Sequence, residues 1–163
     1  MNIFILDLDP EKCAQYHNDR HCSKMILESA QLLSTTVRSF GIDIGYKSTH
    51  INHPCSKWLR ESFQNYLWLS DLITELNDEF IYRFENNHKS YVMFEKDIIP
   101  LENSLFVAYK KAGIETEKMT PFALAMPDEC KTKNPVESYR KYYMKDKRHL
   151  AKWTHRNAPE WWI

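Results

Sequence analysis

The sequence predicts a mostly α-helical protein that folds as a single compact domain over residues 1–163, with a short apolar extended segment at its N-terminus. The chain has an ordinary length for one domain with its own core, and 43% of its residues are hydrophobic. It contains only 3 glycines, which disfavours the left-handed turns that β-hairpins need. Apolar residues recur every three or four positions over long stretches, as in helices with one buried face.

The first 41 residues combine an extended segment with helical sequence. Residues 3–8 form a short apolar run that predicts a buried strand or an extended arm. Asp9-Pro10 suits a helix start, because aspartate caps helices and proline fits the first helical position. We expect a helix from there, with a break or kink at Asn18-Asp19. The helical period then resumes, and Gly41 is its natural end.

The same signals predict the remaining elements. Residues 41–53 contain two of the glycines and are expected to form a loop. From Pro54, apolar spacing of three or four positions continues to Phe84, which predicts one long helix. Asn134-Pro135 is a cap and first position for a last helix, expected to extend to about residue 153. Between these, we expect short helices near 90–98 and 101–112, and irregular chain over 114–133.

Zero net charge conceals an uneven distribution of charge. Residues 1–130 hold 13 Lys and Arg against 19 Asp and Glu, whereas residues 131–156 hold 9 basic residues against 2 acidic ones. A basic block in a neutral chain favours a polyanionic partner, here DNA or a nucleotide. Glycine-rich phosphate loops and the common hydrolase motifs are absent, and no cofactor is predicted.

Cysteine usage and hydropathy predict a cytoplasmic protein. The 4 cysteines include no CxxC pair and are expected to be reduced thiols. The opening MNIFILDLD carries two aspartates and no basic region, so we expect no signal peptide. No apolar run approaches the roughly 18 residues that a membrane span needs.

The basic block contains a segment, YRKYYMKDKRHLAKW at 139–153, in which aromatic and basic residues alternate. Cations neutralise phosphates and aromatic faces stack on unpaired bases, so this segment predicts contact with a nucleotide or extruded base. The alternative is that the tyrosines pack in the core while the lysines face solvent. The predicted substrate-binding residues here are Tyr139, Arg140, Lys141, Tyr142, Tyr143 and Lys145.

A second concentration of ionisable residues is HNDRHCSKMILE at 17–28. Cys13, His17 and His21 lie at i, i+4 and i+8, which would suit zinc if a fourth ligand existed, but packed or surface residues explain them better. Our prediction therefore includes no metal. Instead, the candidate catalytic residues are Glu28 or Asp19 as acid and base and Lys24 as cation or amine nucleophile, with His17 and His21 lining the pocket.

The stretch THINHP at 49–54 places His50 and His53 just before a predicted helix N-terminus. Free N–H groups at such an end can hold a phosphate, so both histidines are candidate substrate-binding residues. A loop without function fits the stretch equally well.

With these residues laid out, the chain resembles the phage-type pyrimidine-dimer DNA glycosylases, the endonuclease V kind. The family ends in Trp-Tyr-Lys-Tyr-Tyr-x-Lys, which Tyr139-Arg140-Lys141-Tyr142-Tyr143-Met144-Lys145 follows closely. Weaker similarities are AQYH at 14–17, His50 before the long helix, and YLWLSDLITELNDEFIYRF within that helix. Together they span most of the chain, and only the C-terminal piece is specific.

The resemblance implies a small all-α fold and excision of bases by cleavage of the N-glycosidic bond. Such enzymes use an N-terminal α-amine, usually on threonine, to form an imine, together with a glutamate in the first core helix. Here Met1 precedes Asn2, a bulky second residue that should prevent removal of the methionine. The glutamate's place falls near Lys24-Met25, with Glu28 a turn later and Asp19 a turn earlier.

We therefore expect an N-glycosylase-type hydrolase that releases a base from damaged or modified DNA, or from a nucleotide such as a cyclic dinucleotide that signals in defence against phage. If the gene is phage-encoded, the enzyme would act in the host cytoplasm. The alternatives are a non-catalytic protein that binds or sequesters nucleic acid or nucleotides, and a metal-dependent nuclease that uses Cys13, His17 and His21.

Overall fold

A computed structural model describes all residues 1–163 and shows a single, mostly helical domain without strands. An isolated bridge between Ser62 and Glu115 is the only β-type pairing. The α-helices are α1 (Pro10–Tyr16), α2 (Asp19–Ser39), α3 (Pro54–Leu59), α4 (Phe63–Phe84), α5 (Lys89–Met93), α6 (Glu102–Lys111) and α7 (Pro135–Asp146). A π-helical turn (Phe94–Ile98) and short 3₁₀ turns (Ile99–Leu101, Asp128–Cys130 and Arg148–Leu150) complete the secondary structure.

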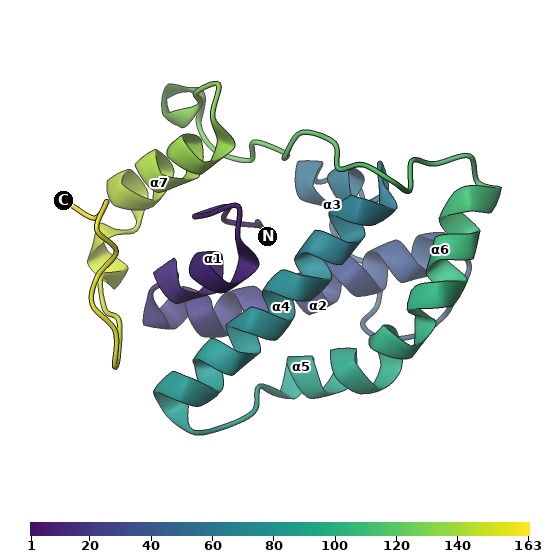
Figure 1. Cartoon of the computed structure of the whole chain (residues 1–163), viewed down its shortest axis with the longest axis horizontal. Coiled ribbons are helices and arrows are strands. Elements are labelled where there is room, and N and C mark those ends of the chain that lie inside the picture. The colour runs from purple at the N-terminus through teal and green to yellow at the C-terminus, as the bar shows by residue number, and fades with distance from the viewer.

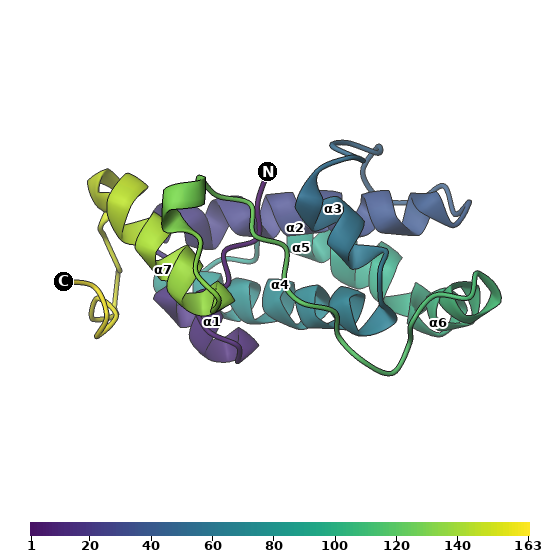
Figure 2. The same ribbon diagram turned by 90° about the horizontal axis from the view of Figure 1, so that it is seen from above.

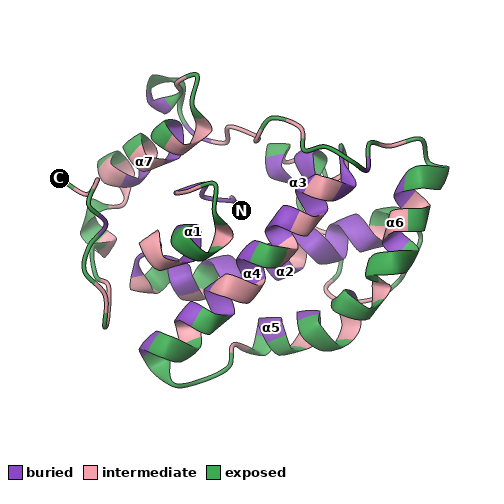
Figure 3. Ribbon diagram, in the orientation of Figure 1, coloured by how far each residue is buried: buried purple, intermediate pink, exposed green.

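Helices α2 and α4 form the centre of the molecule and pack against each other (Figures 1 and 2). α6 lies at one end and α7 with the C-terminal residues at the other, joined by the irregular chain 112–134. The buried residues concentrate on the facing sides of α2 and α4, whereas α6 and α7 expose their outer sides (Figure 3). No helix combines the length and apolar character that crossing a bilayer requires.

The helix starts form as their sequences predict. Asp9 accepts a hydrogen bond from Glu11 N at the start of α1, and Asn134 does the same for Val136 N at α7. The predicted break after the first helix is confirmed: α1 ends at Tyr16, and Asn18 caps α2 by accepting from His21 N at 2.9 Å. This break turns α2 away from α1, so that residues 13, 17 and 21 share no continuous helical face.

The prediction of one long helix from Pro54 to Phe84 is wrong, because the chain breaks at residues 60–62. Ser62 is extended, and its hydroxyl accepts the N–H of Gln64 while it donates to Lys118 O. The N–H of Phe63 binds Glu115 O at 2.9 Å. Chain from the distant segment 115–118 thus satisfies the groups that an uninterrupted helix would have paired internally.

The last helix is shorter than predicted, since α7 ends at Asp146 rather than near residue 153. The chain then runs over α1 and the start of α2. There Trp153 donates to Tyr16 O at 3.0 Å, and Lys152 O accepts from Asp19 N at 2.8 Å. Contacts with distant elements therefore outweigh the local helical pattern of this segment.

The apolar N-terminal run is an extended arm rather than a strand, and Phe4, Ile5 and Leu6 are buried in the core. The thiol of Cys13 donates to Phe4 O and accepts from Leu6 N, which ties the arm to α1. The arm lies between α2 and α7 and brings the first two residues of the chain to the side of α2 (Figure 1).

Candidate functional site

Two of the three candidate catalytic residues, Glu28 and Lys24, lie together at one pocket. The Glu28 side chain lies on α2 and is only 10% exposed. One carboxylate oxygen, Oε2, accepts the N–H of Asn2 at 2.9 Å and lies 3.6 Å from the α-amine of Met1. The other, Oε1, is 3.5 Å from the ammonium of Lys24. One shielded carboxylate therefore faces two amines, one from the N-terminal arm and one from its own helix.

A pocket of about 140 Å³ opens beside this group. Phe4 forms part of its wall, stacked on His21 at 4.7 Å between ring centroids and on Tyr142 at 5.9 Å. The ammonium of Lys147 lies 5.1 Å from the centroid of the Tyr142 ring. The pocket thus combines a carboxylate, stacked rings and cations, and it is lined by Met1, Asn2, Phe4, His21, Lys24, Met25, Glu28, Tyr142 and Lys147.

His21 lines the pocket in its neutral form. The hydroxyl of Tyr143 accepts from Asn18 N at 3.0 Å, so its own proton is free to donate to His21 Nδ1 at 2.9 Å. This leaves Nε2 as the protonated ring nitrogen. Burial and, secondarily, neighbouring positive charges lower the pKa of His21 to about 3. At neutral pH the ring is therefore an apolar and hydrogen-bonding wall rather than a cation.

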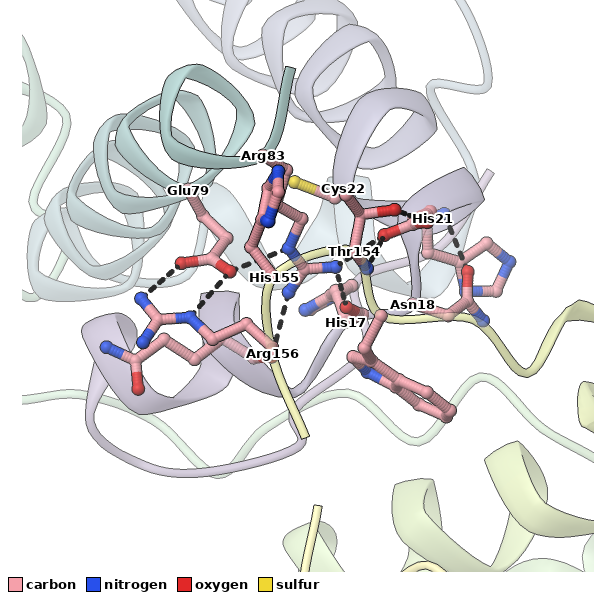
Figure 4. Close-up of polar contacts among 12 residues, drawn as sticks. His17, Asn18, His21, Cys22, Glu79, Arg83, Thr154, His155 and Arg156 are labelled. Atoms are coloured by element: carbon pink, nitrogen blue, oxygen red, sulfur yellow. Dashed lines mark hydrogen bonds and ion pairs between the residues drawn. The ribbon is translucent and has the colours of Figure 1, made fainter. Parts of the chain in front are cut away.

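His17 and Asp19 both contact Arg83, whose surroundings, including His17, Glu79 and Thr154, are shown in Figure 4. His17 is fully buried and donates from Nδ1 to Cys13 O at 2.7 Å, and burial lowers its pKa to about 4. Asp19 binds Arg83 at 3.1 Å and accepts both the N–H and the hydroxyl of Thr154. We therefore assign Asp19 to anchoring the C-terminal segment and His17 to the core, which corrects their expected roles at the substrate.

Residues Cys13, His17 and His21 do not converge on a metal site. No group of three or more His, Cys, Asp or Glu side chains in the structure has metal-binding geometry. The thiol of Cys13 is directed to Phe4 O, and burial raises its pKa to about 12, which disfavours the thiolate that zinc requires. The geometry gives no support to the metal-dependent nuclease.

The two loop histidines differ in their surroundings. His53 caps α3 by accepting from Cys55 N at 3.2 Å, and partial burial followed by the positive charge of the Met1 amine lowers its pKa. It therefore lies within electrostatic reach of the Glu28 group. His50 has a left-handed backbone with φ of 48° and contacts Thr49 Oγ1 at 2.7 Å on the exposed side of the loop. Neither histidine lines the pocket.

The six aromatic and basic residues of α7 that were predicted to bind substrate divide into four groups. Tyr139 and Tyr143 are fully buried, so they support the helix from the core and present no ring to a ligand, contrary to expectation. Lys141 and Lys145 bind Glu129, through its backbone and its carboxylate respectively. Arg140 binds Leu6 O and Asp7 and stacks on Tyr16 and Trp161. Among the six predicted ligand-binding residues, only Tyr142 reaches the pocket.

Sequence reasoning missed five lining residues: Met1, Asn2, Phe4, Met25 and Lys147. Lys147 had a signal in the aromatic and basic segment 139–153, and the N-terminal amine had one through the family resemblance. The distance of that amine to Glu28 depends on how the arm folds back. Comparisons with protein-family models, curated proteins and solved structures find no match for this chain.

The two buried histidines predict loss of stability in acid. In the unfolded chain, histidine gains a proton near pH 6.5, whereas folded His17 and His21 stay neutral down to about pH 4 and 3. Their stabilising contribution is therefore complete above pH 6.5 and is lost progressively as the pH falls towards those values. Each histidine should lower the free energy of unfolding by on the order of 2 kcal/mol at pH 5 relative to pH 8. Urea unfolding at pH 8, 6 and 5 measures this change. His17→Gln should flatten this dependence, and an unchanged slope would contradict the assignment.

Proposed function

We propose that this protein is an N-glycosylase that releases a base from damaged or modified DNA or from a nucleotide, with Glu28 as its acid and base. The observation that carries the proposal is the shielded Glu28 carboxylate beside the Met1 α-amine in a pocket with stacked rings. The cations Lys24 and Lys147 at that pocket support an anionic substrate. Four buried free cysteines agree with a reducing compartment such as the cytoplasm.

Two amines lie near Glu28, and their surroundings assign them different roles. The side chain of Met1 is only 3% exposed and its amine lies against the shielded oxygen of Glu28, so we assign this amine as the nucleophile. The side chain of Lys24 is 56% exposed, and we assign its ammonium to contact phosphate.

The proposed reaction starts with transfer of one proton from the Met1 ammonium to Glu28, which yields a neutral amine and a carboxylic acid. The amine forms a bond to the sugar C1′ while the bond from C1′ to the base breaks, and the departing base receives the bonding electrons and the proton of Glu28. The attached nitrogen returns one proton to the Glu28 carboxylate. The sugar ring then opens as the bond from C1′ to the ring oxygen breaks and the second nitrogen proton passes to that oxygen, which gives an imine that water hydrolyses. In the alternative route, Glu28 activates water to attack C1′ directly.

The experiment that tests the function incubates the protein with ultraviolet-irradiated DNA, modified DNA and cyclic dinucleotides, and detects free base by chromatography. Addition of borohydride traps the imine, and peptide mass mapping locates the adduct. We expect base release from one substrate class and an adduct at Met1, with intact mass confirming Met1 as the first residue. Base release without an adduct would favour the water route.

A non-catalytic binding protein is the second candidate, and the cations at the pocket favour it equally. It predicts binding without release of base from any member of the panel. This outcome would overturn the enzymatic proposal. Salt dependence of the affinity then reports whether phosphate contacts carry the binding.

A further inference from the structure

The side chain of Asn2 is enclosed by partners from three separate parts of the fold. Its amide nitrogen, Nδ2, donates to Ala125 O at 2.9 Å, in the irregular chain before α7. Its oxygen, Oδ1, accepts the N–H of Ile3 at 2.8 Å and the thiol of Cys55, on α3, at 3.5 Å. The hydroxyl of Tyr139, on α7, lies 3.4 Å from the same oxygen. Both ends of this short side chain are therefore held, which fixes the position of the Asn2 backbone.

That backbone forms the closest contact with the Glu28 carboxylate. The N–H of Asn2 donates to Glu28 Oε2 at 2.9 Å, and the α-amine one residue earlier lies 3.6 Å from the same oxygen. Because the two nitrogens belong to consecutive residues, a displacement of the Asn2 backbone also moves the Met1 amine. The side chain of Met1 is only 3% exposed, so it offers the amine little freedom of its own.

We propose that Asn2 is the positioning residue of the site. Its side chain clamps the N-terminal arm, which keeps the Met1 amine beside the Glu28 carboxylate. Its catalytic consequence rests on the proposed function, whereas the clamp itself does not. Asn2 acts through Glu28 and Met1, the two groups that carry the proposed chemistry.

The test variant is Asn2→Leu, which is close to asparagine in shape, lacks its hydrogen bonds and is bulky enough to retain Met1. The matched control is Asn77→Leu, because Asn77 also donates one hydrogen bond, to Asn87, and accepts one, from His88 N, away from Glu28. Intact mass and circular dichroism establish that each variant keeps Met1 and its helices.

The direct readout is the amide resonance of residue 2 in proteins labelled with ¹⁵N. Replacing Glu28 by glutamine removes a charged acceptor from the Asn2 N–H, so Glu28→Gln should shift this resonance in the wild-type and Asn77→Leu backgrounds. In the Asn2→Leu background, Glu28→Gln should leave the amide resonance of residue 2 almost unshifted, because that N–H no longer binds residue 28. An equal shift in all three backgrounds would overturn the clamp, whether or not the protein is an enzyme.

The catalytic readout uses the substrate that the panel identifies. Asn2→Leu should lower kcat on the order of tenfold to a hundredfold, with KM close to wild type, because misplacing a reacting group by about 1 Å has effects of this size. Asn77→Leu should change neither constant. A rise in KM with unchanged kcat would contradict a positioning role. If no substrate reacts with the wild type, the proposed function fails while the resonance experiment still decides the clamp.

Discussion

Glu28→Gln is expected to reduce base release by about 10²–10⁴-fold while leaving the fold and the affinity for substrate intact. Glutamine keeps the shape of the side chain and still accepts the N–H of Asn2, but it cannot exchange a proton with the Met1 amine. Single-turnover measurements of free base, made with enzyme in excess, isolate this step from binding. Affinity measured in parallel should stay within a few-fold of wild type.

The matched control is Asp19→Asn, which changes the other carboxylate predicted from the sequence as a possible acid and base. Asp19 accepts from Arg83 and Thr154, away from the pocket, so its loss should lower stability and leave the rate of the folded protein near wild type. The reverse pattern, an inactive Asp19→Asn and an active Glu28→Gln, would transfer the acid and base role to Asp19 and refute the site described above.

The parts of the fold that sequence predicts well are those set by neighbouring residues. Asn18 interrupts the first helical stretch because its side chain caps the next helix locally, and the sequence shows this. The break near Ser62 had no comparable signal, because its competitor is the carbonyl of Glu115, more than fifty residues away. α7 likewise ends early because Asp19 and Tyr16 hold the chain that follows it.

The candidate site shows the same division. Glu28 and Lys24 are one helical turn apart, so their proximity was readable from the sequence. Met1 reaches Glu28 only because the arm folds back between α2 and α7, a long-range arrangement that no local pattern specifies. Within α7 the sequence could not distinguish buried Tyr139 and Tyr143 from Tyr142, which differ only in the side of the helix on which they lie.

Both ends of the chain meet the first half of α2, at Glu28 and at Asp19. The N-terminal arm delivers Met1 to Glu28, while Thr154 near the C-terminus binds Asp19. Tyr143 connects the two regions, since its hydroxyl contacts both Asn18 N and the ring of His21. Stability of the ion-pair cluster and geometry of the pocket wall are therefore physically connected through α7.

Arg83→Met should cause the largest loss of stability, about 3–5 kcal/mol, because it leaves buried acceptors without their cation. The Arg83 side chain is fully buried and donates to Glu79 at 2.7 Å and to Asp19 at 3.1 Å. The guanidinium also donates to the carbonyls of His17 and Gln15 at the end of α1, and both carbonyls lose this charged donor when Arg83 is replaced. Methionine preserves most of the volume and none of these bonds, and urea unfolding at pH 7 measures the change.

Lys131→Met serves as the comparison, since it removes a cation whose partner Asp128 is exposed to solvent. Exposed pairs are screened by water and salt, so the unfolding midpoint of Lys131→Met should match wild type. Because Arg156 still binds Glu79 in the Arg83→Met protein, the double change with Arg156→Met should destabilise it further by leaving Glu79 with no cation at all. Equal midpoints for Arg83→Met and wild type would show that this cluster is solvated in solution and does not hold the two ends of the chain.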